Sequence, residues 1–415
     1  MRLHGCACGW CSIVPPYVFD AMERSPHAEV RSVVEDTRRA DAIFRTARAN
    51  FMAATPMAKL ALAPEEHPLR RVVFDCESSN DLARKQVLAE GGPVPGDDCV
   101  REAYAGAEST WKFYNQIFQR SSVDNDGLTL VSSVHYRRKY NNAVWNGQQM
   151  AYGDGDGVIF ERFTKSLDVI GHELTHGVTQ YTAGLQYQGQ SGALNEHFSD
   201  VFGILVKQWS LNQTDPKAAG WLIGEGLFMP SINGKALRSM SDPGTAYDDQ
   251  ASGLGTDPQP AHMRDYQELP NTEDSDFGGV HINSGIPNRA FHLAATALGK
   301  PAWQTAGKIW YVTLTERLRP DADFEKCANE TISVARDFFG NDEAEAVASA
   351  WVAVGVTRAG AGAMASLAPA AISRIRAGVT LGRKKTGKKA AAKPAKGKAK
   401  KRPAKAKTKR RKRAR

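Results

Sequence analysis

Two histidines four residues apart, with a glutamate between them, are the side chains of this sequence best suited to hold a metal ion. They lie in the run His172-Glu173-Leu174-Thr175-His176. On a helix these histidines share one face, so both imidazoles can bind a single tetrahedral zinc ion. Zinc with an open position activates water, and Glu173 would take its proton and pass it to a leaving amine. The run predicts metal-assisted hydrolysis, although a polar surface helix gives the same pattern by chance in roughly one per cent of chains.

Two later clusters supply the other groups that such chemistry needs. In the run from Gly192 to Asp200, Glu196 completes a site of two histidines and one carboxylate. Asp200 follows one helical turn later, where it would accept a hydrogen bond from the far nitrogen of a ligand histidine. In the run from Asp276 to Gly285, His281 would donate to an oxyanion.

These three clusters, in this order and spacing, resemble the thermolysin family of zinc metalloproteases over roughly residues 70 to 358. The resemblance implies one catalytic zinc ion held by His172, His176 and Glu196. It also implies that Tyr187 assists His281 and that Asp276 orients it. Neutral endopeptidase activity on protein or peptide substrates is the implied function.

The resemblance extends to substrate binding. The run Asn141 to Trp145 resembles the family's edge strand, which implies that Asn142 and the Ala143 carbonyl pair with substrate backbone. Arg238 matches an arginine that holds a substrate carbonyl. A pocket for the residue after the cut is implied at Phe160, Phe163, Val169, Ile223, Leu227 and Leu237. Each alone is more often a plain core residue, but together they predict cleavage on the N-terminal side of large apolar residues.

The sequence departs from thermolysin at the family's paired calcium site. The matching positions keep Asp168 and Glu225 but carry Lys207 and Leu222 in place of carboxylates. We expect the Lys207 ammonium to replace the cation, so that the calcium site is lost. The alternative is that Lys207 points to solvent.

The N-terminal run Cys11 to Tyr17 resembles the short propeptides of the protealysin-like branch of the family. This implies a self-processing zymogen with a propeptide and linker at residues 1–67, cut near Pro56, Pro64 and Pro68. We expect the segment to lie across or beside the cleft as an intramolecular inhibitor. Either Pro15-Pro16-Tyr17 anchors it by packing, or a Cys11 thiolate fills the open position on zinc.

The elements that must position these residues form an α+β protein of two lobes. A surface helix is predicted within 24–52, and a β-rich N-terminal lobe at 68–205 begins with strands such as Arg71 to Phe74 and Leu128 to Val131. Leu167, Ile170, Leu174 and Val178 mark the central zinc-binding helix. A mostly helical lobe follows at 206–358, and the predicted helical windows of the C-terminal half are 193–208, 286–298, 303–318 and 323–354, broken at Gly340.

Composition fits a globular chain with 42% hydrophobic and 24% charged residues, and no stretch approaches the about 18 apolar residues of a membrane span. Met1 to Met22 lack the apolar core of a conventional signal peptide. Six cysteines, three of them near the N-terminus, do not form a disulfide pattern. We therefore expect synthesis in the cytoplasm, with export by another route left open.

The net charge of +9 is concentrated at the C-terminus. Residues 383–415 hold 19 of the 54 Lys and Arg residues and no Asp or Glu, which leaves 35 basic against 45 acidic residues elsewhere. Residues 359–415 are predicted to be a disordered linker and a basic tail rich in Lys, Arg, Ala and Pro. The tail would bind nucleic acid or another polyanion through charge, or serve only as a soluble extension.

Two other functions are open from the sequence alone. A nucleic-acid-binding protein with a vestigial peptidase body would explain the tail, although the retention of Glu173, Glu196 and His281 argues against it. A metal-storage or metal-sensing protein would use Cys6, Cys8 and Cys11, but only one residue separates the first two.

Overall fold

The computed structural model of the 415-residue chain describes residues 12–54 and 67–358. These residues belong to one compact unit, which ends at Ala368. Cys6, Cys8, Cys11 and the basic tail lie outside the described residues, and so does most of the linker. The hypotheses about them stay predictions.

A five-stranded mixed sheet with the strand order β2-β1-β3-β5-β4 is formed by strands within residues 71–152. Its strands are β1 (Arg71–Asp75), β2 (Lys85–Ala89), β3 (Leu130–Val134), β4 (Ala143–Trp145) and β5 (Met150–Tyr152). β1 pairs with β3 and β3 with β5 in parallel, whereas β2 and β4 are antiparallel to their neighbours. β4 is an edge strand, so one side of its backbone is available for pairing.

Helix α3 (Asp98–Phe118) was not among the elements predicted from the sequence. It begins at a cap where the Asp97 side chain accepts a hydrogen bond from the Val100 amide at 3.1 Å. A Cβ added to Gly106 would come within 2.3 Å of an Ile170 side-chain atom. The absence of a side chain at Gly106 therefore lets α3 approach the helix that carries His172 and His176 closely.

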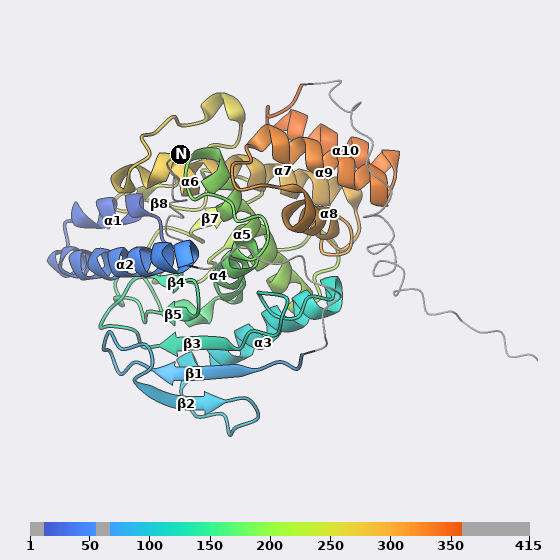
Figure 1. The fold of residues 1–415 in the computed structure, drawn as a ribbon. Coiled ribbons are helices and arrows are strands. Elements are labelled where there is room, and N and C mark those ends of the chain that lie inside the picture. The colour runs from blue at the N-terminus through green and yellow to red at the C-terminus, as the bar shows by residue number, and fades with distance from the viewer. Residues whose placement is uncertain (1–11, 55–66, 359–415) are drawn as a thin grey trace, which may run out of the picture. The chain divides into compact units, whose positions relative to one another are not determined.

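Helices α4 (Leu167–Gln180) and α5 (Gly189–Ser210) form the centre of the molecule, between the sheet and the C-terminal helices (Figure 1). Almost every residue of both is buried. A Cβ on Gly203 would lie 2.4 Å from the Asp168 carbonyl, and one on Gly171 would lie 3.1 Å from the Gly203 Cα. These two glycines bring the helices close enough for the clusters around His172 and Glu196 to face each other.

The C-terminal part is mostly helical, as the sequence predicts. Its longer elements are α6 (Asp276–Asn283), α7 (Gly285–Leu298), α8 (Ala306–Val312), α9 (Phe324–Phe338) and α10 (Asn341–Ala353). Short strands connect them to α5, namely β6 (Leu222–Ile223), β7 (Arg238–Ser239), β8 (Asp248–Asp249) and β9 (Gly255–Thr256). Short 3-10 turns at η2 (Met263–Asp265) and η3 (Glu273–Ser275) and the π-helical turn η4 (Thr313–Arg317) complete it, whereas the turn η1 (Phe163–Lys165) lies in the N-terminal part, directly before α4.

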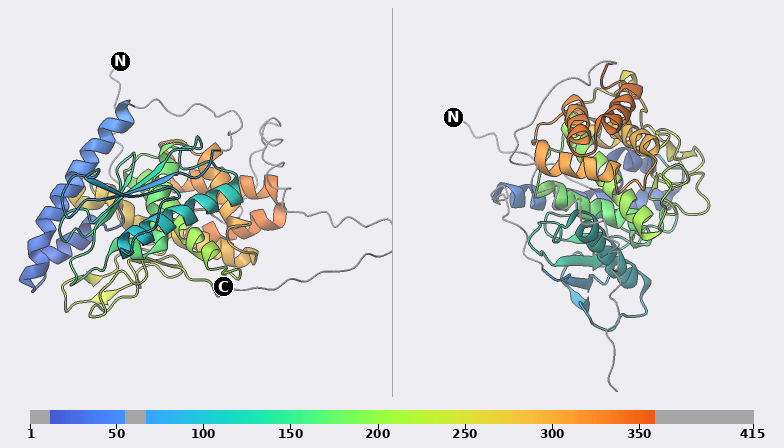
Figure 2. Two further views of the ribbon diagram at one scale, coloured as in Figure 1. Left: turned by 90° about the horizontal axis from the view of Figure 1, so that it is seen from below. Right: turned by 90° about the vertical axis from the view of Figure 1, so that its right-hand side faces the viewer.

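The N-terminal segment forms two helices, α1 (Pro16–Glu23) and α2 (Ala28–Ala54), and α2 corresponds to the helix predicted within 24–52. Figure 2 shows α2 running along one side of the body formed by residues 67–358. Ala40 and Phe44 of α2 are buried against Tyr136, Tyr140 and Val144. Within the described residues, no helix is long and apolar enough to span a membrane.

Candidate active site

The three predicted metal ligands meet at the interface of α4 and α5. The Nε2 atoms of His172 and His176 lie 2.9 Å apart, and each lies 3.5 Å from a carboxylate oxygen of Glu196. All three side chains are fully buried. Glu196 Oε2 has no hydrogen-bond partner among the described residues. Two imidazole nitrogens and an unsatisfied carboxylate oxygen that converge at this depth fit a zinc ion.

The Nδ1 atoms of His172 and His176 also have hydrogen-bond partners. His172 Nδ1 lies 2.9 Å from Asp200 Oδ1, and His176 Nδ1 lies 2.9 Å from both Asn195 Oδ1 and Ser199 Oγ. Each ring therefore turns its Nε2 toward Glu196. The sequence predicted the Asp200 contact but missed Asn195 and Ser199, which lie one residue before Glu196 and one residue before Asp200.

Asp200 is a buried carboxylate that several groups stabilise. Arg238 donates to it through two nitrogens at 2.8 and 3.0 Å, and Asn288 donates at 2.9 Å. Burial would raise the pKa of Asp200, but the Arg238 charge and the His172 contact lower it well below its ordinary value. Burial likewise would lower the pKa of His172, whereas Asp200 and Glu196 raise it to about 9.

Glu173 lies on the same helix and connects the metal ligands to the edge strand. Its Oε2 atom accepts a hydrogen bond from the Trp145 backbone amide at 2.9 Å, and the side chain is fully buried. This bond fixes the carboxylate beside β4, where a substrate strand would pair.

His281 owes its orientation to an unusual turn at the start of α6. Asp276 and Phe277 have positive φ angles of 53° and 50°, and Gly278 and Gly279 continue with 87° and 73°. The turn folds the Asp276 carboxylate back onto His281, where it accepts from the backbone amide at 2.8 Å and contacts Nδ1 at 2.6 Å. A side chain at Gly278 would press on Gly189 at 3.1 Å. Asp276 and Phe277 are residue types that favour right-handed backbone, so their positive φ angles are strained. This strained turn positions His281.

His281 is positioned to donate hydrogen bonds from both ring nitrogens. Its Nε2 lies 3.0 Å from the Ser12 carbonyl, which can only accept, and Nδ1 faces the Asp276 carboxylate. Burial disfavours the charged ring, but the charges of Glu196 and Asp276 raise the pKa of His281. Tyr187 donates to Glu196, and its hydroxyl lies 3.2 Å from His281 Nε2. The tyrosine hydroxyl therefore links Glu196 to His281.

Residues Ser12 to Val14 of the N-terminal segment lie on the predicted substrate-binding residues. The Ala143 carbonyl accepts from the Ile13 amide at 3.2 Å, and Asn142 Oδ1 accepts from the Val14 amide at 3.0 Å. Arg238 donates to the Ile13 carbonyl at 3.0 Å. The sequence predicted docking by Pro15-Pro16-Tyr17 or Cys11 but missed these contacts of Ser12 to Val14. The β-branched pair Ile13-Val14 before two prolines is the signal that could have revealed them.

The six apolar positions of the predicted specificity pocket are all buried. Their exposed fractions do not exceed 2%, the value for Leu237. The rings of Phe160 and Phe163 lie 5.5 Å apart, and a Cβ on Gly224 would lie about 3 Å from Leu227 and Leu237 side chains. Leu227 and Leu237 thus pack near each other around Gly224, and Phe160 packs near Phe163.

His197 lies next to Glu196 in sequence but takes no part in the site. Its Nδ1 contacts Asn288 at 2.8 Å, and its Nε2 accepts from the Trp310 indole at 2.8 Å. Burial lowers the pKa of His197 to about 4, so the ring is neutral and serves the core.

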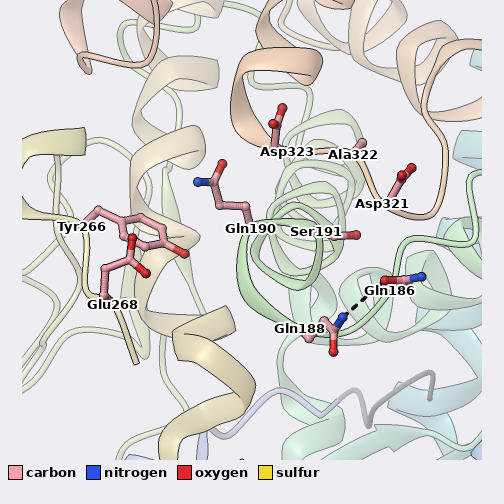
Figure 3. A pocket seen from close by; sticks show the side chains of 9 residues that line it. All are labelled: Gln186, Gln188, Gln190, Ser191, Tyr266, Glu268, Asp321, Ala322 and Asp323. Atoms are coloured by element: carbon pink, nitrogen blue, oxygen red, sulfur yellow. Dashed lines mark hydrogen bonds between the residues drawn. The ribbon is translucent and has the colours of Figure 1, made fainter. Parts of the chain in front are cut away.

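A polar cavity of about 440 Å³ lies beside the segment that carries Tyr187, and Figure 3 shows its lining. It is lined by Gln186, Gln188, Gln190, Ser191, Tyr266, Glu268, Asp321, Ala322 and Asp323. Its amides and carboxylates differ from the apolar lining expected of the specificity pocket.

Lys207 occupies the position where the sequence predicts a replacement for calcium. Its Nζ lies 3.1 Å from Glu225 and 3.5 Å from Asp168, and the side chain is 17% exposed. The ammonium therefore lies between the carboxylates rather than in solvent. Burial lowers the pKa of Lys207, but the two carboxylates outweigh burial and raise it.

Comparison with known proteins agrees with this geometry. Family models described as thermolysin metallopeptidase, catalytic domain, and thermolysin metallopeptidase, alpha-helical domain, match residues 90–180 and 183–356. An extracellular metalloprotease of Pectobacterium carotovorum subsp. carotovorum is 48% identical over 353 residues, which cover 83% of this chain and 96% of that protein. The chain belongs to the thermolysin family of metallopeptidases.

Two further comparisons place the chain within the thermolysin family. Protease PrtS of a Photorhabdus strain is 47% identical and is matched over 69% of this chain and 76% of its own length. The solved structure of the precursor of protealysin, from Serratia proteamaculans, has 48% identity and a TM-score of 0.73, covering 84% of this chain and all of that one. The two chains therefore share one fold over most of their length.

The predicted fold class and enzyme class are thus confirmed. The chain is a thermolysin-like zinc metalloendopeptidase with a catalytic domain and an alpha-helical domain. A vestigial peptidase body, or metal storage as the main function, is not supported. The exact boundaries predicted at 67, 205 and 358 stay predictions.

Proposed function

We propose that the chain is a self-processing zymogen whose active form cuts proteins and peptides on the N-terminal side of large apolar residues. One observation carries the proposal. Ser12 forms an antiparallel bridge with Val144 of β4, and Ser12 to Val14 contact the residues that the family resemblance assigns to substrate. The N-terminal segment therefore occupies the place of a substrate and blocks it.

His172, His176 and Glu196 would hold the zinc ion in this proposal. The ion supplies a Lewis acid that polarises the substrate carbonyl and lowers the pKa of water. Asp200 fixes the ring of His172, and the Arg238 pair fixes Asp200 in turn. This arrangement keeps the His172 ligand nitrogen pointed at the ion.

Glu173 is the proton carrier and not a ligand. The Trp145 amide holds its carboxylate next to the strand that pairs with substrate. From there it takes a proton from the attacking water and delivers it to the leaving nitrogen. His281, oriented by Asp276, donates to the carbonyl oxygen as negative charge develops on it, and Tyr187 supports His281.

Specificity follows from the apolar residues near the substrate backbone. Leu237 directly precedes Arg238, which holds the Ile13 carbonyl, and the Leu237 amide bonds to the Ile223 carbonyl. Ile13 itself is completely buried in the precursor. A large apolar side chain at this position stabilises binding by removing apolar area from water.

The propeptide helices reinforce the block. Asp41 of α2 accepts from the Tyr140 hydroxyl and from Asn142 Nδ2, the latter at 3.1 Å. Asn142 also holds the Val14 amide. α2 therefore braces the same asparagine that binds the docked strand. Inhibition then depends on packing and backbone pairing over the whole segment, with its removal near the Pro-rich linker as the activating step.

The paired calcium site is replaced by the ion pairs of Lys207 in this proposal. A cation that the chain supplies itself makes stability independent of dissolved calcium.

A protein digestion assay tests the proposed function. The full chain, freed of metal by chelation and then given zinc, should digest casein after a lag in which it processes itself. Glu173→Ala should bind one zinc per chain and digest nothing, because the residue handles protons and leaves the ligands intact. Digestion that persists in Glu173→Ala, or fails to depend on zinc, contradicts the proposal.

A further inference from the structure

The N-terminal segment is bound in the direction and spacing of a substrate. Ser12 forms an antiparallel bridge with Val144 of β4, and Ile13 donates its amide hydrogen to the Ala143 carbonyl at 3.2 Å. Val14 donates to Asn142 Oδ1 at 3.0 Å. Two consecutive amides are thus fixed, one by the β4 backbone and one by the side chain of the residue before β4, and these contacts set the position of the peptide bond between Ser12 and Ile13.

The carbonyl groups of Ser12 and Ile13 accept hydrogen bonds from different side chains. Arg238 donates to the Ile13 carbonyl at 3.0 Å, and Arg238 is itself locked to Asp200. His281 Nε2 donates to the Ser12 carbonyl at 3.0 Å. Only the Ser12 carbonyl therefore contacts the donor assigned to the developing oxyanion.

We propose that Ser12–Ile13 is itself a cleavage site, the first bond that the active site hydrolyses. The inference rests on the proposed function, and it adds a processing site that lies far before the Pro-rich linker. The bond joins a carbonyl at the oxyanion donor to an amide paired with Ala143, and a large apolar residue follows it.

The chemistry balances with one water molecule. Water oxygen bonds to the Ser12 carbonyl carbon, the C–N bond to Ile13 breaks, and Glu173 carries a water proton to the Ile13 nitrogen. The products are a twelve-residue peptide ending in a Ser12 carboxylate and a chain that begins with the Ile13 amine.

Neighbouring bonds are poorer candidates. In the Ile13–Val14 bond, the Ile13 carbonyl accepts a hydrogen bond from Arg238 and not from His281. The next two bonds lead into Pro15 and Pro16, whose nitrogens carry no hydrogen and cannot pair with β4. The register therefore selects a single bond.

The cut leaves most of the inhibitor in place. The new chain keeps Ile13, Val14, α1 and α2, and the contacts of Asp41 with Tyr140 and Asn142 are untouched. Activation then has two stages. The first releases residues 1–12, and the second removes the remaining segment at the linker.

Time-resolved mass spectrometry in ¹⁸O-enriched water tests the proposal. The full chain is expressed and purified without zinc, and zinc starts the reaction at several protein concentrations. We expect a peptide of residues 1–12 with ¹⁸O in its terminal carboxylate, together with a chain starting at Ile13, before any cut at the linker. The rate should not change with protein concentration, because the bond is already bound within its own molecule.

Variants and a binding readout separate the geometry from the chemistry. Ile13→Asp places a carboxylate at a fully buried position and should slow the cut about a hundredfold, whereas Glu35→Ala, on an exposed part of α2, should cleave at the wild-type rate. In zinc-free protein, amide hydrogen exchange should show protection at Ile13 and Val14, which does not depend on activity.

The outcomes distinguish the two proposals. If the same sample digests casein while Met1 stays attached until the linker is cut, the inference is wrong and the proposed function stands. If neither cleavage nor casein digestion occurs with bound zinc, both are wrong. A Ser12–Ile13 cut whose rate rises with protein concentration, or unprotected amides at Ile13 and Val14, also overturns the inference.

Discussion

Replacing Lys207 by methionine should destabilise the protein and show what stands in for calcium. Asp168 is fully buried and takes part in hydrogen bonds from Ser166, from the Val169 amide at 3.1 Å and from the Gly224 amide at 3.0 Å. Lys207→Met removes the only cation that contacts Asp168 among the described residues, but it leaves these hydrogen-bond donors in place. Breaking a buried ion pair costs about 3–5 kcal/mol, and the remaining donors reduce this to about 2 kcal/mol.

Scanning calorimetry at one fixed heating rate measures the effect. All proteins carry Glu173→Ala, so that self-digestion does not distort the transition. A loss of about 2 kcal/mol lowers Tm by about 3 °C in a folded body of this size. Lys217→Met, at an exposed lysine, is the matched control and should leave Tm within about 1 °C.

Calcium completes the test. Millimolar calcium should leave the Tm of the Lys207 protein unchanged, because the ammonium occupies the place of the ion. Lys207→Glu restores a carboxylate beside Asp168 and Glu225, so its Tm should rise with calcium; a ligand at a hundred times its Kd adds about 2.7 kcal/mol. A clear rise in Tm of the unchanged protein with calcium, or equal losses in Lys207→Met and Lys217→Met, would refute the reasoning.

The metal site was predictable because its signals are local. The spacing of His172 and His176 on one helix, and of Glu196 and Asp200 on the next, predicts which side chains share a face. Chain order alone does not show that the two helices meet. That contact depends on Gly171 and Gly203, whose missing side chains the sequence displays without indicating what approaches them.

Two features escaped prediction. Helix α3 did carry a helical signal, because its buried residues Val100, Ala103, Tyr104 and Ala107 recur every three or four positions, but this periodicity was overlooked. The docking of Ser12 to Val14 depends on backbone amides and carbonyls, which every residue possesses. Side-chain patterns therefore pointed to the neighbouring prolines and to Cys11 instead.

Three further predictions concern the metal, the propeptide and pH. Glu196→Ala should lose zinc on dialysis, whereas Glu196→Asp should retain more; one zinc per chain in Glu196→Ala, measured by atomic emission, would rule out Glu196 as a ligand. Asp41→Ala should loosen the propeptide and shorten the lag before casein digestion, whereas Glu35→Ala on an exposed part of α2 should not. His135 hydrogen-bonds Asp154 and Asp97, which raise its pKa to about 9 from the ordinary 6.5 despite burial. Its charge therefore stabilises the fold fully below about pH 6.5, and about 1–2 kcal/mol should be lost as pH rises through 9. Urea unfolding of the Glu173→Ala protein should show this loss, and His135→Gln should abolish it.

The cut positions in an unfolded substrate test the central claim most directly. The activated enzyme digests denatured casein for a short time, and mass spectrometry reads every new N-terminus. The account predicts that most new N-termini are Leu, Ile, Phe or Val, with no products from Glu173→Ala, because apolar residues beside Arg238 receive the side chain after the cut. New N-termini that instead follow basic residues, or that show no preference for an apolar first residue, would contradict the account.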